Sequence, residues 1–134
     1  VWRLTIDEEP LTVIVVDIRA KPFRHRKAAF ELLLPALEKY ADENTIVLGD
    51  FNTPPDSVFF APIREDYGNA FEVAGNGLHV TWPVPLPVIA IDHIWFNEGL
   101  TPVRTFTRPT WRSDHLPIVA EFDWSNGVPS DRTW

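Results

Sequence analysis

Cysteine and methionine are both absent from the 134 residues of the sequence. Without cysteine, disulfide bonds, zinc–thiolate sites and thiol nucleophiles are excluded. Without methionine, and with Val1 already inside a strand-like pattern, we expect a processed protein or a segment excised from a longer one. Neither absence identifies a cellular compartment.

Long apolar runs and a surplus of positive charge are also missing. The longest apolar candidates, Leu11–Val16 and Pro83–Ile91, fall well short of the ~20 residues that span a bilayer. The sequence has 12 Lys and Arg against 19 Asp and Glu, which gives a formal net charge of −7. A broad basic surface for nucleic acid is therefore absent, and duplex nucleic acid is a disfavoured partner.

The rest of the composition is that of an ordinary globular domain. Apolar residues make up 45% of the sequence and charged residues 23%, both near average usage. The length fits a single domain. We expect residues 1–124 to form this domain and residues 125–134 to be a tail.

Strand-like and helix-like patterns alternate along the chain. The expected elements are a hairpin of Val1–Thr5 and Leu11–Ile18, a helix Lys27–Tyr40, a strand Thr45–Leu48, a short helix Ser57–Glu65 capped by Asp56, and strands Val88–Phe96, Val103–Arg108 and Pro117–Trp124. Pro35 is expected to kink or split the first helix, and Tyr67–Leu78 is expected to be irregular. This order predicts an α/β (α+β) fold, in which a mixed β-sheet layer carries helices on one face.

Three expected strands end in polar clusters, which are Gly49–Asn52, Ile91–His93 and Ser113–His115. Loops at strand ends often carry functional side chains. Asp50 and Asn52 are two residues apart, so an extended backbone points both to one face. Asp92 interrupts an apolar strand and needs a partner, because burying a lone carboxylate is costly. A set of Asp, Asn and His without cysteine favours a hard divalent cation, Mg²⁺ or Mn²⁺.

The motifs GDFN at 49–52, IDHIW at 91–95 and SDHLPI at 113–118, in this order, resemble the endonuclease/exonuclease/phosphatase superfamily, also called deoxyribonuclease-I-like. The resemblance covers roughly residues 11–123 and matches the C-terminal half of that domain. It implies half of a four-layer sandwich and a phosphoesterase that depends on Mg²⁺ or Mn²⁺, with a phosphate ester as substrate.

The resemblance also implies a role for each motif residue. Asp50 would orient and activate the attacking water and contribute to the metal site. Asn52 would steady the phosphate in the transition state, and Asp114 would be a metal-site carboxylate. His115 would contact the scissile phosphate, and Asp92 would orient His115 and favour its protonated form.

Three further residues are candidates for substrate binding. Arg19 stands where superfamily members often carry a histidine or tyrosine that serves the leaving group. Arginine binds an oxyanion but does not readily donate a proton at neutral pH. Trp82 and Trp111 flank the motifs, and two interpretations stay open for them: shaping a substrate pocket, or packing under a loop. Of the other histidines, His93 is expected to be structural, and His25 and His79 are expected to be exposed.

Superfamily members have an N-terminal half that this sequence lacks, including a glutamate that serves as principal metal ligand. One face of the predicted sheet would then be exposed. We expect that face to be covered by a missing N-terminal half or by self-association of two copies. The alternative function is a non-catalytic interaction or structural module, since a fold alone does not establish an activity.

Overall fold

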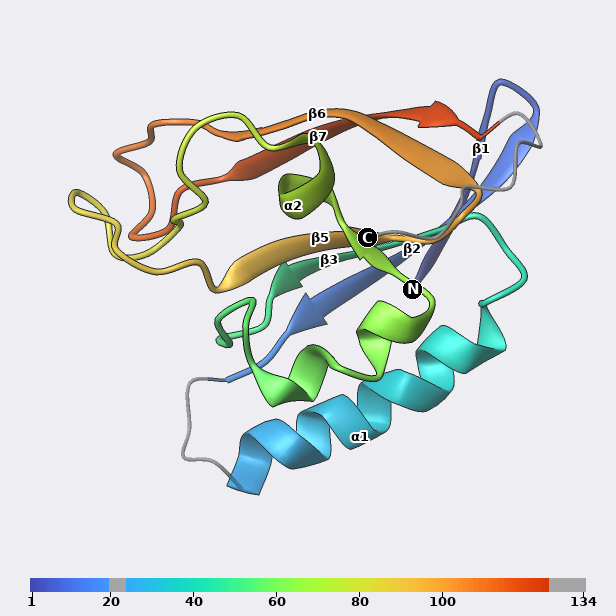
Figure 1. Ribbon diagram of the computed structural model, residues 1–134, viewed down its shortest axis with the longest axis horizontal. Coiled ribbons are helices and arrows are strands. Elements are labelled where there is room, and N and C mark those ends of the chain that lie inside the picture. Colours follow the sequence, from blue (N-terminus) through green and yellow to red (C-terminus); the bar gives the residue numbers. More distant parts are fainter. Residues whose placement is uncertain (20–23, 126–134) are drawn as a thin grey trace.

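A computed structural model of the protein describes residues 1–19 and 24–125, with side chains for 1–19 and 26–125. At its centre lies a five-stranded mixed sheet with the order β1-β2-β3-β5-β4 (Figure 1). The strands are β1 Trp2–Ile6, β2 Glu9–Asp17, β3 Thr45–Asp50, β4 Gly68–Asn69 and β5 Asp92–Phe96. The predicted α/β class is confirmed. The expected tail beyond Ser125 lies outside the described residues.

The strand pairing of this sheet combines local and long-range contacts. β1 and β2 form the expected antiparallel hairpin, and its turn holds Asp7 and Glu8 at positive φ. β2 and β3 are parallel neighbours, while β3 and β5 are antiparallel neighbours. The carboxyl ends of β2 and β3 therefore lie beside the first residue of β5.

One face of the sheet is covered by helix α1 Arg24–Lys39 and by two 3₁₀ turns, η1 Val58–Phe60 and η2 Ile63–Glu65 (Figure 1). Buried side chains such as Phe30, Phe60 and Trp95 fill this interface. The expectation that Pro35 splits the helix is wrong, since α1 continues through it. Pro35 is exposed, so the backbone carbonyl that loses its amide partner can be hydrated.

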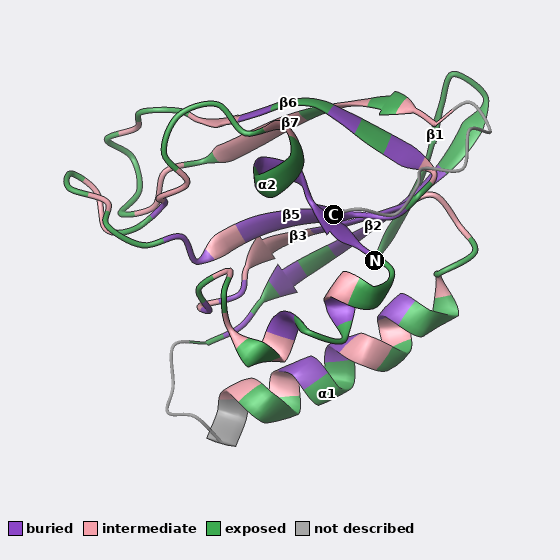
Figure 2. Cartoon of the chain, viewed as in Figure 1, coloured by how far each residue is buried: buried purple, intermediate pink, exposed green. Residues whose placement is uncertain are grey.

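The opposite face carries a second layer, a two-stranded sheet of β6 Leu100–Thr107 and β7 Ile118–Trp124. Apolar residues of β2, β3 and β5 pack against it, and Figure 2 shows the buried residues concentrated in the middle layer. The expectation that this face is left open is therefore wrong for its greater part. Near β1 it does stay open, because Trp2, Leu4, Ile6 and Val15 are exposed.

Two short segments between β3 and β5 differ from expectation. The stretch Ser57–Glu65 is two 3₁₀ turns instead of one helix, with Ser57 rather than Asp56 as the first cap. Pro62 precedes the second turn and offers no amide to continue a helix. The stretch expected to be irregular contains β4 and a helix, α2 Ala70–Ala74.

The Asn69 side chain starts α2 by accepting hydrogen bonds from the amides of Phe71 and Glu72.

Within the described ranges, no helix combines the length and hydropathy that crossing a membrane requires.

Candidate active site

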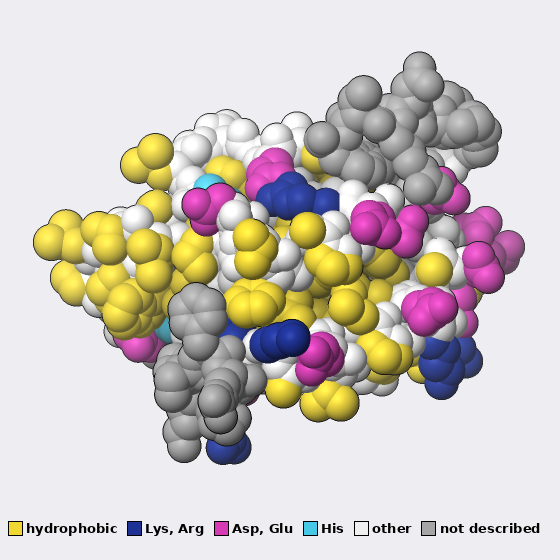
Figure 3. All heavy atoms as spheres, turned by 60° about the horizontal axis from the view of Figure 1, so that its bottom comes forward, with side chains coloured by type: hydrophobic (Ala, Val, Ile, Leu, Met, Phe, Trp, Pro, Cys, Tyr) yellow, Lys and Arg dark blue, Asp and Glu magenta, His cyan; other side chains and the backbone are white. Residues whose placement is uncertain are grey.

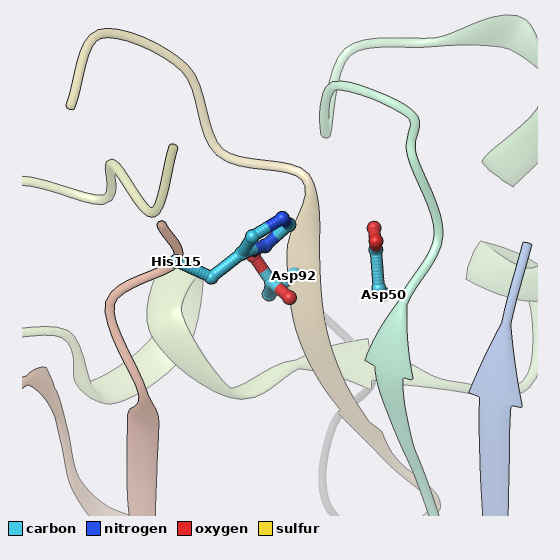
Figure 4. A group of neighbouring side chains, drawn as sticks. All are labelled: Asp50, Asp92 and His115. Atoms are coloured by element: carbon cyan, nitrogen blue, oxygen red, sulfur yellow. The ribbon is translucent and has the colours of Figure 1, made fainter. Parts of the chain in front are cut away.

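Asp50, Asp92 and His115 meet at one end of the central sheet (Figure 4). Asp50 is the last residue of β3 and Asp92 the first of β5, and the two are register partners. His115 comes from the loop between β6 and β7. One ligand atom from each side chain lies within 4.8 Å of the others. Two strand ends and a distant loop thus bring three of the predicted residues together.

The turn after β3 holds the Asp50 carboxylate in place. Gly49 has a φ of +139°, and a Cβ there would lie 1.9 Å from the Val16 carbonyl oxygen, so only glycine fits. The Asn52 backbone amide donates to Oδ1 of Asp50 at 2.8 Å, and Asn52 Nδ2 donates to Oδ2 at 2.9 Å. Nδ2 also donates to the Ile18 carbonyl at 2.7 Å. Asn52 therefore positions Asp50, and its contact with phosphate stays a prediction.

His115 and Asp92 form a paired group. Nδ1 of His115 lies 2.9 Å from Oδ2 of Asp92, and both side chains are mostly buried. Burial by itself would lower the pKa of His115, but the hydrogen bond to Asp92 and the nearby carboxylates outweigh it and raise that pKa. A protonated His115 bound through Nδ1 keeps its Nε2–H as a donor for an anion.

Negative charge accumulates around Asp50. Burial raises the pKa of Asp50, and the charges of Asp92 and Asp17 add to this, against the amide hydrogen bond from Asn52. Asp17 is the register partner of Asp50 on β2. Neighbouring carboxylates at a partly buried site are relieved by a proton or by a cation. Of the three side chains that could hold an ion, the two carboxylates fit the chemistry of a hard divalent metal, and a protonated His115 has no lone pair to offer it.

Thr81, which the sequence reasoning missed, connects the two halves of the site. Its buried Oγ1 accepts from the amides of Ile91 at 3.1 Å and Asp92 at 3.3 Å. Its carbonyl accepts from the Leu116 amide at 2.7 Å. Thr81 therefore braces the start of β5 against the loop that carries His115. No spacing or motif marks this residue in the sequence.

Two other histidines lie behind the site. His93 is fully buried, as its expected structural role requires, and its Nε2 donates to the Thr53 carbonyl at 2.8 Å. Burial lowers the pKa of His93 to about 4. The expectation that His79 is exposed is wrong: it is half-buried and stacks on Phe71, with ring centroids 4.3 Å apart. The His25 side chain lies outside the described residues.

The remaining predicted residues lie around the rim. Asp114 is exposed, and its Oδ2 accepts from Nε1 of Trp82 at 3.4 Å. Asp114 is not part of the group of three, so its role as a metal ligand stays a prediction. Arg19 is exposed just beyond β2. Trp111 is 86% exposed, so packing under a loop is the wrong interpretation for it.

A pocket of about 310 Å³ opens beside the paired group. Asp92 and His115 form part of its wall, and Leu48, Ile94 and Ile118 contribute apolar surface. A mostly apolar hollow with a few converging polar groups is typical of ligand sites. The arrangement can therefore hold an anionic group at His115 with an apolar group beside it.

The sequence profile of the Endonuclease/Exonuclease/phosphatase family matches residues 2–115. The chain belongs to this family, as the three motifs indicated. It is 29% identical to the Bos taurus endonuclease/exonuclease/phosphatase family domain-containing protein 1 over a 123-residue alignment, which covers 75% of this chain and 21% of that protein.

Solved structures share the fold. A mannosyl-6-phosphatase from Bacteroides thetaiotaomicron matches with a TM-score of 0.65 and 18% identity, over 87% of this chain and 51% of that one. TDP2 of D. rerio, complexed with a single-strand DNA product, matches with a TM-score of 0.70 and 17% identity, over 90% and 59%. The chain thus spans about half the length of these structures and about a fifth of the bovine relative. These two neighbours are thus a phosphatase and a protein with a single-strand DNA product bound.

Proposed function

We propose that the protein is a divalent-metal-dependent phosphoesterase and that these residues form its C-terminal catalytic half. The observation that carries the proposal is the His115–Asp92 pair at 2.9 Å, with Asp50 in the same cluster. Family membership supports it.

In the proposed mechanism, each side chain acts at a stated atom. The Asp50 carboxylate, held by Asn52, orients a water and accepts its proton. His115, kept protonated by Asp92, donates from Nε2 to a phosphoryl oxygen as charge develops there. Asp50 would hold Mg²⁺ or Mn²⁺, and Asp114 is the second ligand that the family resemblance suggests. The ion, when bound, supplies charge neutralisation at the phosphate.

We propose a phosphomonoester or phosphodiester of modest size as substrate. Among the structural neighbours, the phosphatase favours a phosphomonoester and the DNA-bound protein favours a phosphodiester, so neither ester type is preferred. The net charge of −7 opposes wide contact with duplex nucleic acid. Arg19 and Trp82 stay proposed substrate contacts, together with Trp111.

The test is hydrolysis of an aryl phosphomonoester and an aryl phosphodiester with Mg²⁺ or Mn²⁺. We expect Asp50→Ala and His115→Ala each to lower kcat/KM by about 10²–10³-fold or more, as loss of a preorganised group does. The matched control is Asp56→Ala, which removes an exposed carboxylate outside the cluster and should leave the rate unchanged. Unaltered rates in both site variants would contradict the proposed roles.

The second candidate function is a non-catalytic interaction or structural module. It is favoured by the place of Asp114, the expected second metal ligand, outside the cluster of Asp50, Asp92 and His115, and a fold alone does not establish an activity. Absence of metal-dependent hydrolysis in the unaltered protein would support this module. We also propose that the exposed part of the sheet face near β1 is covered, by the rest of such a domain or by a second copy.

A further inference from the structure

Apolar side chains gather at the end of the molecule that carries the site. Residues 80–91 contain no charged side chain. Within this stretch Leu86 is 78% and Val88 is 70% exposed, and Trp82 and Ile89 are partly exposed. Together with Trp111 we call these residues the apolar tip. Figure 3 shows hydrophobic side chains collected at this end of the molecule, at the left of the view.

Hydrogen bonds hold the tip in place. Trp82 and Ile89 pair across the loop, with the Trp82 amide donating to the Ile89 carbonyl at 3.0 Å and the reverse bond at 3.1 Å. The Val84 amide donates to the Asp114 carbonyl at 2.8 Å. The loop is thus closed on itself and tied to the loop of His115. Leu86 and Val88 are therefore exposed on a tethered loop that is bonded to the loop of His115 and leads into Asp92.

The geometry points to a lipid surface as the occupant of the apolar tip. Three prolines, Pro83, Pro85 and Pro87, separate the tip's side chains. Because proline has no amide hydrogen, little backbone needs to be desolvated when the tip enters an apolar phase. A protein partner would more often meet polar groups mixed into such a surface.

The rim of the tip fits the polar side of a membrane interface. The Trp82 indole N–H donates to Asp114, so the ring has a polar edge and an apolar body. Rings of this kind gather at the headgroup level of membranes. Arg108 and Arg112 are exposed and lie close to Trp111 in the sequence. Arginines in this position attract anionic headgroups. The apolar tip therefore combines aliphatic and tryptophan side chains, and its rim carries the two arginines together with the Asp114 carboxylate.

This inference rests on the proposed function and narrows its substrate. A molecule docked by the tip would present the phosphate ester of an amphiphile to His115, with its apolar part against Leu48 and Ile94 in the pocket. The substrate class is then a phosphate ester held at a lipid–water interface.

The test is cosedimentation of the protein with vesicles of phosphatidylcholine, and with vesicles that also hold phosphatidylglycerol. We expect binding that is stronger to the anionic vesicles. The double variant Leu86→Asp/Val88→Asp should lower the partition coefficient at least ~10-fold, because two charges then enter the interface. The matched controls are Leu32→Asp and Val58→Asp, whose side chains are each 80% exposed on the α1 side. Both should bind as the unaltered protein does.

Three results would overturn the inference: no binding by the unaltered protein, equal binding by the tip variant, or equal loss in the controls. A tip variant that changes the protein's sedimentation coefficient without lipid would make the tip a protein interface instead. Hydrolysis of the soluble aryl phosphates separates the two proposals. Vesicle binding without any hydrolysis would contradict only the proposed phosphoesterase function. Hydrolysis without vesicle binding would contradict only the proposal that the tip docks on a lipid surface.

Discussion

At the scale of single residues, the pKa values of Asp50 and His115 are both raised, but by different causes. Burial and neighbouring carboxylates raise the pKa of Asp50, whereas His115 owes its raised pKa to Asp92 acting against burial. The carboxylate is thereby poised to take a proton or a cation, and the imidazole to remain protonated. Hydrolysis of a phosphate ester is helped by both properties: a base that accepts a proton from the attacking water, and a cationic donor that binds a phosphoryl oxygen.

Asp92→Asn tests the support that Asp92 gives to His115. Loss of the carboxylate lowers the pKa of His115, because its charge partner is gone. Activity that requires protonated His115 falls as the pH rises through that pKa, so the basic limb of the kcat/KM profile should move to lower pH. At pH 7 we expect kcat/KM to drop by about 10–100-fold, the usual effect of removing a carboxylate that orients a histidine.

The control for Asp92→Asn is Asp123→Asn, which changes an exposed carboxylate on β7. Its pH profile should match that of the unaltered protein. A basic limb that stays in place in Asp92→Asn would assign Asp92 a purely structural role.

His93 predicts a pH dependence of stability. Its pKa of about 4 in the folded protein lies below the ordinary value of 6.5. Its buried Nδ1 has no hydrogen-bond partner in the described part of the chain, so a proton there would be unsatisfied. The unfolded chain binds the proton first. Stability is therefore fully present above pH 6.5 and is lost as the pH falls toward 4, by about 1.4 kcal/mol per pH unit.

Chemical denaturation at several pH values, with a chelator present, measures this slope. His93→Gln keeps an amide donor for the Thr53 carbonyl but does not titrate. Its stability should fall less steeply between pH 6.5 and 4 than that of the unaltered protein. Equal slopes for the two proteins would show that another group dominates.

At the scale of elements, the site depends on how three loops are braced. The turn after β3 is held by Asn52, the start of β5 by Thr81, and the loop of His115 by the Leu116 amide on Thr81. Thr81 belongs to none of the motifs, yet its Oγ1 accepts from the Asp92 amide, and its carbonyl accepts from the amide of Leu116, the residue after His115.

Thr81→Val keeps the shape of the side chain but removes its oxygen. The buried amide of Ile91 and the partly buried amide of Asp92 then lose their acceptor, which should cost about 1–3 kcal/mol of unfolding free energy. We also expect lower kcat at unchanged KM, because Asp92 and His115 lose their relative placement. Thr81→Ser keeps the hydroxyl and should restore the turnover of the unaltered protein. A turnover lost equally in both variants would indicate a packing effect rather than the hydrogen bonds.

The elements that sequence patterns predicted well are those with strong periodicity. The hairpin, α1, β3, β6 and β7 lie within a few residues of the expected ranges, since their apolar positions repeat along one face. The strand expected over Val88–Phe96 begins only at Asp92, because Trp82 and Ile89 pair with each other. The helix α2 has five residues, too few for a periodic signal.

At the scale of the whole molecule, the chain forms three layers: helix, sheet and a β6–β7 ribbon (Figure 1). The ribbon covers the sheet beside β3 and β5 but leaves the part of that face near β1 open. Trp2, Leu4 and Ile6 face that opening, in register with β2. An exposed patch of this kind usually marks a contact surface.

We therefore predict that residues 1–134 self-associate when studied alone. Sedimentation velocity should show a concentration-dependent species larger than the monomer, because two copies can bury the open face. Trp2→Asp/Leu4→Asp should yield a monomer at the same concentrations, while Leu32→Asp on α1 should associate like the unaltered protein. If the unaltered protein stays monomeric at high concentration, self-association is ruled out. The rest of a larger domain is then the remaining candidate for covering the open sheet face near β1.

Local information already specified much of this protein. The motif residues follow strands whose apolar periodicity is visible in the sequence. The residue types indicate hard-metal chemistry, and the resemblance of the three motifs to the family implies phosphate chemistry. The spatial relations required the folded chain. Asp50 meets Asp92 through the antiparallel register of β3 with β5, and His115 reaches Asp92 through a loop 23 residues away. Thr81, the covering ribbon and the exposed tip depend likewise on contacts between distant segments, which no local pattern encodes.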